Sequence, residues 1–314
     1  MISSRRNLLK LMACSATVPL LPKIAGAQDR RAVWHVLGSN GGPRVVTNRS
    51  NPANVLMIGD TPYIVDCGYG VTRQLVRAGL PLTSLEQIFI THLHSDHALE
   101  CGNLIYCSWS TGLDNEVTVH APEGAKAMMD AYMESIRFDL DVRIGDENKP
   151  DLRNMVKVRE IGDSGVVFEN SDVTVTAFRT PHPPIVKRNY AFRFDVAEGS
   201  FVYACDTAYN PALADFAQGA DVLIHEALYE PGFADMAVRS RNKSESFREH
   251  IFNSHTSTEH VGQIAAAAKV KKLVLSHLVP GDDESITDDM WLEGVRRHYD
   301  GEAIVAHDFM EITI

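Results

Sequence analysis

Short apolar runs separated by polar turns dominate the chain from residue 32 onward. Runs rich in β-branched and aromatic residues are typical of buried strands, whereas apolar positions at helical spacing are typical of amphipathic helices. Strands in hairpin-like order with helices between the blocks predict two mixed sheets that face each other, with helices outside. The predicted strands are 32–38, 54–58, 62–65, 87–90, 117–120, 173–178, 190–195, 201–205, 222–224 and 272–276, and the predicted helices are 72–78, a segment ending near 106, 122–150 and 258–268.

The most concentrated chemistry in the chain is the run 91–97, which reads THLHSDH directly after a predicted strand. Alternate side chains of an extended segment share a face. Imidazole nitrogens and carboxylate oxygens together are ligands for Zn²⁺, with Mn²⁺ or Fe also possible. We therefore predict that His92 and His94 reach one ion, while Asp96 and His97, at the turn into the next helix, reach a second.

Three further polar side chains stand at the ends of later predicted strands, namely His182, Asp206 and His277. Each repeats the context of the first run, an apolar strand followed by a ligand-type side chain. One loop cannot saturate two metal ions, so these side chains are expected to complete the site. The predicted sets are His92, His94 and His182 for one ion and Asp96, His97 and His277 for the other, with Asp206 bridging.

The first residues match an export signal rather than part of the fold. Residues 4–10 read SRRNLLK, which fits the twin-arginine pattern, and a short apolar stretch at 11–21 precedes a small-x-small site at 25–27. The apolar stretch is too short and too interrupted by prolines to span a membrane stably. We predict a signal peptide at 1–27, a single domain at 28–314 and a periplasmic location, with no membrane span after signal removal.

The charge of the chain bears on its partners. The formal net charge is −11, and because residues 1–27 hold four basic residues and no acid, the mature chain would carry −15. A strongly acidic protein repels polyanions at long range. The charge therefore weighs against nucleic acid, but it does not exclude a small anionic ester held by the metals. A homodimer is compatible with the sequence.

Four cysteines remain after residue 27, namely Cys67, Cys101, Cys107 and Cys205. An oxidising periplasm would allow them to pair. However, Cys67 and Cys205 end strand-like runs, and the other two lie on differing faces of a predicted helix. We favour buried free thiols, and a disulfide stays open as the alternative.

Together these motifs resemble the metallo-β-lactamase superfamily, whose metal motif is HxHxDH followed by a distant His, an Asp and a His. Within it the sequence is most similar to ribonuclease Z and its arylsulfatase-like branch, over nearly the whole mature chain. The resemblance implies a four-layer αββα sandwich of α/β class, with a dinuclear site at one edge of the paired sheets. It also implies that Asp66 is the buried aspartate that orients the ligands from behind. The matching segments include 37–38, 51–52, 66–68, 74–80, 88–91, 220–227 and 274–277.

Two further segments resemble elements of ribonuclease Z. Residues 225–227, HEA, resemble its HEAT element, and 255–257, HTS, resemble its HST loop with the last two residues exchanged. The resemblance implies that Glu226 orients His255, which stabilises or protonates the leaving oxygen. The chain departs from the pattern in lacking a long Gly/Pro-rich arm of the kind that grips transfer RNA, and its segment 230–253 is longer than expected.

The resulting hypothesis is a dinuclear zinc hydrolase of a small phosphodiester or sulfate ester that uses a metal-bridging hydroxide. The candidate catalytic residues are Asp96, His255 and Glu226. Alternatives among enzymes are a ribonuclease Z-type endoribonuclease for 3′ tRNA processing, then a lactonase, and then a β-lactamase in which Cys205 takes the place of Asp206. The alternative outside enzymes is a periplasmic metal-binding protein without catalysis.

Overall fold

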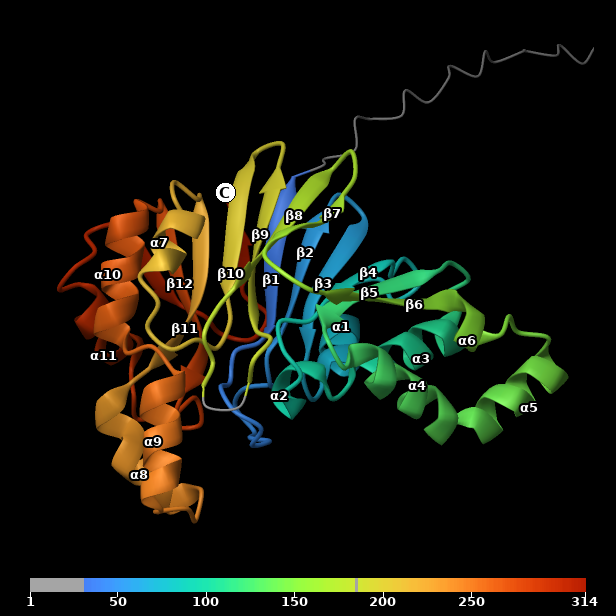
Figure 1. Ribbon diagram of the computed structural model, residues 1–314, viewed down its shortest axis with the longest axis horizontal. Helices are drawn as coiled ribbons and strands as arrows, with labels where there is room; N and C mark the ends of the chain where they lie inside the picture. The colour runs from blue at the N-terminus through green and yellow to red at the C-terminus, as the bar shows by residue number, and fades with distance from the viewer. Residues whose placement is uncertain (1–30, 184–185) are drawn as a thin grey trace, which may run out of the picture.

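The computed structural model describes residues 31–183 and 186–314, whose strands form two seven-stranded sheets that face each other (Figure 1). The first sheet has the order β14-β1-β2-β3-β4-β5-β6 and the second β13-β12-β11-β10-β9-β8-β7. The strands of the first sheet are β1 (Ala32–Gly38), β2 (Ala53–Ile58), β3 (Thr61–Cys67), β4 (Gln87–Phe89), β5 (Val117–Pro122), β6 (Val156–Ile161) and β14 (Glu311–Thr313). Those of the second are β7 (Gly165–Glu169), β8 (Val173–Arg179), β9 (Tyr190–Val196), β10 (Gly199–Ala204), β11 (Val222–Leu228), β12 (Lys272–Val279) and β13 (Glu302–Val305).

Helices cover the outer face of each sheet. Those beside the first sheet are α1 (Val71–Arg77), α3 (Cys101–Thr111), α4 (Ala125–Ser135), α5 (Arg137–Glu147) and α6 (Leu152–Met155). Those beside the second are α7 (Ala212–Phe216), α10 (Thr258–Ala268) and α11 (Asp288–Val295). The short α2 (Ser95–Ala98) follows β4, and η1 (Glu230–Gly232), α8 (Phe233–Arg239) and α9 (Glu245–Ser254) form a separate unit below the second sheet in Figure 1.

The alternation of side chains along the strands explains the four layers. In β2 every residue is buried, because Val55 and Met57 pack under the outer helices while Leu56 and Ile58 face the opposite sheet. Between the sheets, the Trp34 ring lies 5.7 Å from that of Phe194. The predicted αββα sandwich is therefore confirmed.

Several predicted elements have the expected bounds. β1 and α10 coincide with the predicted strand 32–38 and helix 258–268. The predicted hairpin forms as antiparallel β2 and β3 around Gly59, which has a positive φ of 58°. This turn favours glycine because that backbone conformation is disfavoured for side chains with a Cβ.

Two predictions about the second sheet are wrong in detail. β11 continues to Leu228 rather than ending at 224, so Glu226 lies within a strand. β12 continues to Val279, so His277 lies inside a strand rather than after it. The pairing of β11 with β12 shifts at this point, which leaves His277 as an extra residue with a φ of 44°. A bulge therefore turns this side chain toward the site without ending the strand.

The cysteines agree with the prediction of buried free thiols. All four cysteines of the described residues are free, and only Cys107 is not fully buried. The predicted signal peptide at 1–27 lies outside the described residues. In the part of the chain that the structure describes, no helix has the length and apolar character needed to cross a membrane.

Candidate active site

The run after β4 occupies the carboxyl end of the parallel strands β3, β4 and β5. Asp66, at the end of β3, holds this run from behind and is fully buried with a φ of 62°. Its Oδ1 accepts the backbone N–H of Thr91 at 2.9 Å, and its Oδ2 lies 2.8 Å from Nδ1 of His97. This contact fixes the orientation of the His97 ring and leaves its Nε2 for the centre of the site.

A first group of candidate ligands joins both sheets. The available ligand atoms of His92, His94, His182 and Asp206 lie within 4.8 Å of one another. His94 Nδ1 lies 2.9 Å from Nε2 of His92 and 3.3 Å from Nε2 of His182. The other ring nitrogen of His182 lies 3.2 Å from the carbonyl oxygen of Ser254, which orients the ring.

A second group forms beside it from Asp96, His97, Asp206 and His277, again with ligand atoms within 4.8 Å. Asp206 Oδ1 lies 3.3 Å from His97 Nε2 and 2.9 Å from His277 Nε2. Its other oxygen, Oδ2, faces the first group and lies 4.0 Å from Nε2 of His92. Asp206 therefore presents one oxygen to each group, which is the geometry that a bridging ligand requires.

The chemistry of these side chains fits divalent metal ions. His97 Nε2, Asp206 Oδ1 and His277 Nε2 are buried without a hydrogen-bond partner, although buried polar atoms in proteins are nearly always paired. These three orphaned atoms face one another. Imidazole nitrogens and carboxylate oxygens suit zinc, and also manganese or iron, so the two groups could hold two such ions.

Burial and charge set the protonation of the two groups. Burial lowers the pKa of His182 to about 4 and, with the neighbouring His97, holds that of His92 well below its ordinary value. These rings are therefore neutral, as metal ligands must be. Burial also acts to lower the pKa of His277, but the Asp206 carboxylate outweighs it and raises this pKa to about 10.

Glu226 and His255 lie next to the second group. Glu226 is buried in β11, where its Oε1 accepts the backbone N–H groups of Thr207 at 3.1 Å and Thr256 at 2.9 Å. Its Oε2 lies 3.1 Å from Nδ1 of His255. Burial by itself lowers the pKa of His255, but the Glu226 carboxylate raises it above the ordinary value. Because Nδ1 of His255 contacts Glu226, its Nε2 is the nitrogen left for a substrate. The His255 ring also stacks on that of His277, with 5.7 Å between the ring centroids.

The structure brings all ten predicted site residues to one place, but it also shows residues that the sequence did not indicate. A Cβ on Gly41 would lie 2.9 Å from His277 Nδ1 and 2.5 Å from Val279 Cγ2, so only glycine lets this loop approach β12. His250 lies on α9 with its ring 6.4 Å from that of His255. The run SNGGP at 39–43 carried a signal for a tight turn, whereas nothing marked His250.

The β-lactamase alternative required Cys205 in place of Asp206. Cys205 instead packs in the core between the sheets, with its thiol 3.2 Å from Oδ1 of Asn189. Neighbouring residues of an extended chain point to opposite sides. Asp206, and not Cys205, therefore belongs to the candidate groups.

The fold matches solved structures over most of both chains. A metallo-β-lactamase fold protein, YhfI from Bacillus subtilis, matches with a TM-score of 0.67 and 20% identity, covering 90% of this chain and 99% of that one. Human tRNase Z, short form, matches with a TM-score of 0.64 at 20% identity and the same coverage. Zn²⁺-bound PqqB from Methylobacterium extorquens matches with a TM-score of 0.58 at 14% identity, covering 90% of this chain and 100% of that one. These likenesses show that the chain has the metallo-β-lactamase fold.

Sequence relatives show the family to which the chain belongs. Ribonuclease Z of Mycobacterium marinum (strain ATCC BAA-535 / M) is 27% identical over 277 residues, which cover 87% of this chain and 96% of that protein. Ribonuclease Z of Mycobacterium sp. (strain KMS) is 30% identical over 244 residues, covering 76% and 82%. The family model described as Anti-Pycsar protein Apyc1 matches residues 36–237. The chain therefore belongs to the family that this model describes. It is a metal-dependent hydrolase of the metallo-β-lactamase superfamily, near ribonuclease Z.

Proposed function

We propose that the chain hydrolyses a small anionic phosphodiester, or a related sulfate ester, at a dinuclear zinc centre. The observation that carries the proposal is the position of Asp206, whose two oxygens face the two ligand groups separately, at 2.9 Å from His277 Nε2 and 4.0 Å from His92 Nε2. Two divalent cations bound there would supply Lewis-acid chemistry, making water a nucleophile near pH 7 and neutralising charge on the reacting ester.

The Glu226–His255 pair supports an ester with a poor leaving group. Glu226 is oriented by two backbone N–H groups, and it holds His255 by Nδ1 at 3.1 Å. Water first loses a proton to solvent, and as the resulting hydroxide oxygen bonds to phosphorus, the bond from phosphorus to the leaving oxygen breaks and its electron pair stays on that oxygen. His255 donates the proton on Nε2 to it, and Glu226 stabilises the cationic ring beforehand.

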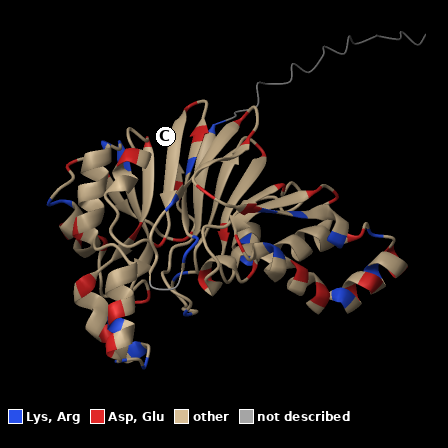
Figure 2. Ribbon diagram, in the orientation of Figure 1, with Lys and Arg blue, Asp and Glu red and all other residues tan. Residues whose placement is uncertain are grey.

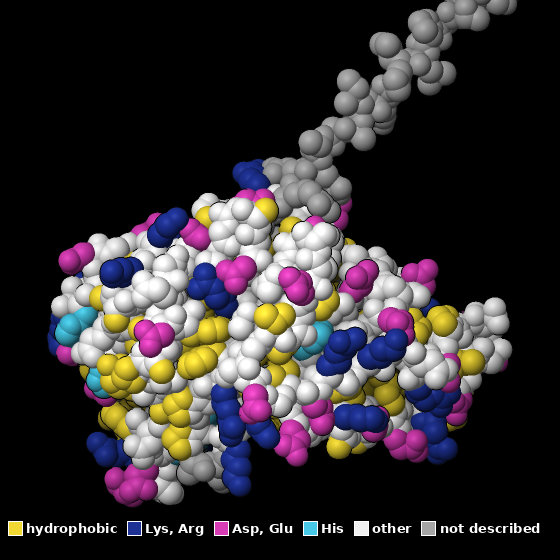
Figure 3. Space-filling view, turned by 45° about the horizontal axis from the view of Figure 1, so that its top comes forward, with side chains coloured by type: hydrophobic (Ala, Val, Ile, Leu, Met, Phe, Trp, Pro, Cys, Tyr) yellow, Lys and Arg dark blue, Asp and Glu magenta, His cyan; other side chains and the backbone are white. Residues whose placement is uncertain are grey.

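Ribonuclease activity is the second candidate. The relatives named ribonuclease Z weigh against the expectation that a nucleic-acid partner is unlikely. Against an RNA substrate, the chain has a net charge of −11. Basic and acidic side chains are interspersed along α4, α5, α8 and α9 in Figure 2 and on the face shown in Figure 3, so these surfaces offer no continuous basic track for a phosphate backbone.

Export by the twin-arginine route stays part of the proposal, on the evidence of the SRRNLLK motif at 4–10. Replacement of Arg5 and Arg6 by lysine should retain the protein in the cytoplasm, as fractionation would show. Release of both forms into the periplasm in equal amounts would contradict this route.

The test of the proposed function is a hydrolysis panel with the zinc-loaded chain. Bis(4-nitrophenyl) phosphate, a phosphocholine ester, 4-nitrophenyl sulfate, a lactone, a β-lactam and a precursor tRNA would be compared at equal concentration. We expect the phosphodiester to be hydrolysed fastest. Cleavage of the precursor tRNA with far higher kcat/KM would favour the ribonuclease. Binding of one metal with no hydrolysis of any substrate would favour a metal-binding protein.

A further inference from the structure

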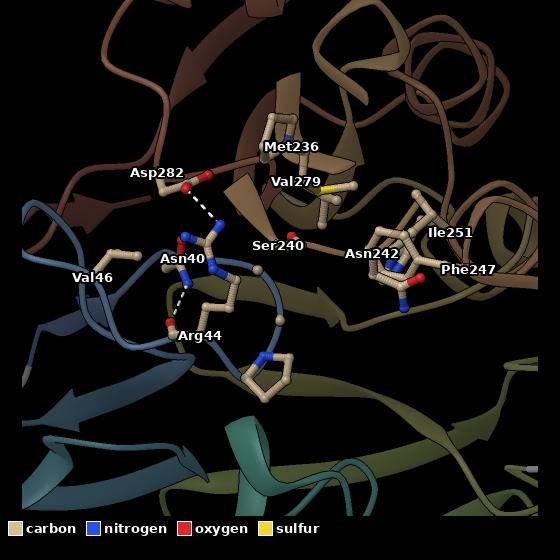
Figure 4. A pocket seen from close by; sticks show the side chains of 15 residues that line it. Asn40, Arg44, Val46, Met236, Ser240, Asn242, Phe247, Ile251, Val279 and Asp282 are labelled. Atoms are coloured by element: carbon tan, nitrogen blue, oxygen red, sulfur yellow. Dashed lines mark hydrogen bonds and ion pairs between the residues drawn. The ribbon is translucent and has the colours of Figure 1, made fainter. Parts of the chain in front are cut away.

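A cavity of about 240 Å³ opens beside His255, between the loop 40–46 and the unit formed by α8 and α9. Figure 4 shows Asn40 and Arg44 on one side of it and Phe247 and Ile251 on the other. Because His255 lines this cavity and also contacts Glu226 at 3.1 Å, the cavity is continuous with the proposed proton donor. A group attached to the leaving oxygen would therefore extend into it.

The walls of this cavity are mainly apolar. Met236, Ile251 and Val279 line it and belong to one buried cluster, against which Phe247 packs. These side chains come from α8, α9 and β12, the elements that also carry or adjoin His255 and His277. Burial of apolar surface here favours an apolar ligand.

The charged groups of the cavity neutralise each other. The Arg44 guanidinium donates to Asp282 at 2.8 Å, and the same carboxylate accepts from Arg239 at 3.0 Å. Asp283 accepts from Arg239 as well, at 2.9 Å. With both arginines paired to carboxylates, the cavity has no net positive charge to hold a second phosphate, and this disfavours a polyanionic leaving group.

The size of the cavity fits a small group. An apolar cavity of about 150 Å³ is known to hold benzene, so 240 Å³ accommodates one ring with a short alkyl chain. Sites for whole ligands are larger, about 300–1,000 Å³. The cavity is therefore suited to one part of a substrate, not to all of it.

We propose that this cavity binds the departing alcohol of the substrate, and that this alcohol is uncharged and largely apolar, of the size of an alkylphenol. The inference rests on the proposed hydrolase function, since it identifies the part of that site that binds the leaving group. Residues from loop 40–46 and from α8 and α9 then determine specificity, while the two ligand groups hold the reacting ester.

The test uses methyl 4-alkylphenyl phosphates, in which the alkyl chain changes the size of the leaving phenol with little effect on its acidity. We expect kcat/KM of the zinc-loaded chain to rise about four-fold for each added methylene from methyl to propyl, and to stop rising when the cavity is full. The same chain lengths placed on the other ester oxygen should have little effect. A flat profile, or a preference for a 4-carboxyphenyl leaving group, would overturn the inference.

Binding of the free 4-alkylphenols, measured by calorimetry, separates this inference from the proposed function. Tighter binding with chain length, without hydrolysis of any ester in the panel, would leave an apolar site and overturn the hydrolase. Hydrolysis of the esters without any dependence of phenol binding on chain length would leave the hydrolase and overturn the cavity assignment.

Two variants test whether the dependence of kcat/KM on alkyl chain length arises in this cavity. Ser240→Phe should fill the cavity, so it should abolish the gain from chain length and also slow the methylphenyl ester, and Phe247→Ala should reduce the gain by removing one wall. Val238→Ala is the matched control, because Val238 is 55% exposed on α8 and does not line the cavity. An unchanged chain-length profile in both cavity variants would place the binding site elsewhere.

Discussion

The two sheets contribute to the candidate site in different ways. The first sheet supplies His92, His94, Asp96 and His97 from one continuous run after β4. The second sheet supplies His182, Asp206 and His277 from three separate strands, and His277 reaches the site through a bulge. One residue can position a continuous run of ligands, whereas ligands from separate strands depend on the packing of the whole sheet.

Each sheet nevertheless holds one site residue in the left-handed region of the backbone. In the first it is Asp66, with a φ of 62°, and in the second it is His277, with a φ of 44°. Such conformations are costly for residues other than glycine, and they cluster at functional sites. The two sheets therefore differ in whether their ligands come from one continuous run or from separate strands. Single substitutions can test this difference.

The largest expected effect comes from the one carboxylate that faces both ligand groups. Asp206→Asn should lower kcat/KM on the order of 10³-fold, because charge stabilisation by both ions depends on it, and should reduce bound metal below two ions per chain. His94→Ala in the continuous run should cost less, since His94 belongs to one group and is only half-buried. Asp215→Asn, at an exposed acid of α7, is the control. Equal losses for Asp206→Asn and His94→Ala would contradict the bridging role.

The next effect concerns His255, which the second sheet orients through Glu226. His255→Ala should slow hydrolysis of alkyl phosphodiesters by about 10²–10⁴-fold, the usual range for a lost proton donor, and should slow nitrophenyl esters far less. Glu226→Gln should act in the same direction, and the double variant should add little to His255→Ala. The measurement compares the hydrolysis rates of matched alkyl and nitrophenyl esters. Equal losses of rate for both esters would contradict the role of His255 as proton donor.

Two residues that position metal ligands, Asp66 in β3 and Gly41 in the loop after β1, should differ in their effect on metal binding. Asp66→Asn should weaken binding of the metals about 10–100-fold, as is usual for a residue that orients metal ligands, because it positions both Thr91 and His97. Gly41→Ala should disturb the ion at His277 alone, since the added Cβ meets Nδ1 of that ring. Competition with a chromophoric chelator measures both affinities. The same loss at both ions in Gly41→Ala would show that the two ligand groups are not positioned independently.

The last effect changes stability and not catalysis, and it concerns His120, a histidine in the body of β5 rather than at a strand end. Burial lowers its pKa to about 4, and the ring stacks on Phe89 at 4.8 Å. The unfolded chain then binds a proton that the folded chain does not, so stability is lost as pH falls from about 6.5 to 4, by at most about 3 kcal/mol. His120→Gln should make the free energy of unfolding less dependent on pH over this range, without changing metal content.

Denaturant unfolding at several pH values measures this contribution. His307→Gln is the control, because the side chain of His307 is half-exposed. A pH dependence in His120→Gln as steep as that of the parent chain would mean that other groups carry it.

Much of the fold could be predicted from the sequence because the central strands are buried on both faces. β2 and β10 read as apolar runs for that reason. The strands that the sequence did not indicate are β6, β7, β13 and β14, which are the four edge strands of the two sheets. Edge strands face solvent and carry polar residues, as in Val156–Ile161, so their pattern is weak.

The ligand sets could be predicted because ligands follow apolar strands, and this local rule holds for the continuous run. It failed in detail for His277, since a bulge depends on the pairing of two distant strands and leaves no local pattern. The α8–α9 unit was also not predicted, because residues 230–253 are polar and mixed in charge. The cavity beside His255 depends on that unit and could not be derived from the sequence.

Anomalous diffraction at the zinc edge, from crystals of the zinc-loaded chain, tests the dinuclear centre most directly. We expect two peaks about 3.5–4 Å apart, one beside His92, His94 and His182 and the other beside Asp96, His97 and His277, with Asp206 between them. A single peak, or two peaks that do not share Asp206, would contradict the proposal that the two sheets build one dinuclear centre.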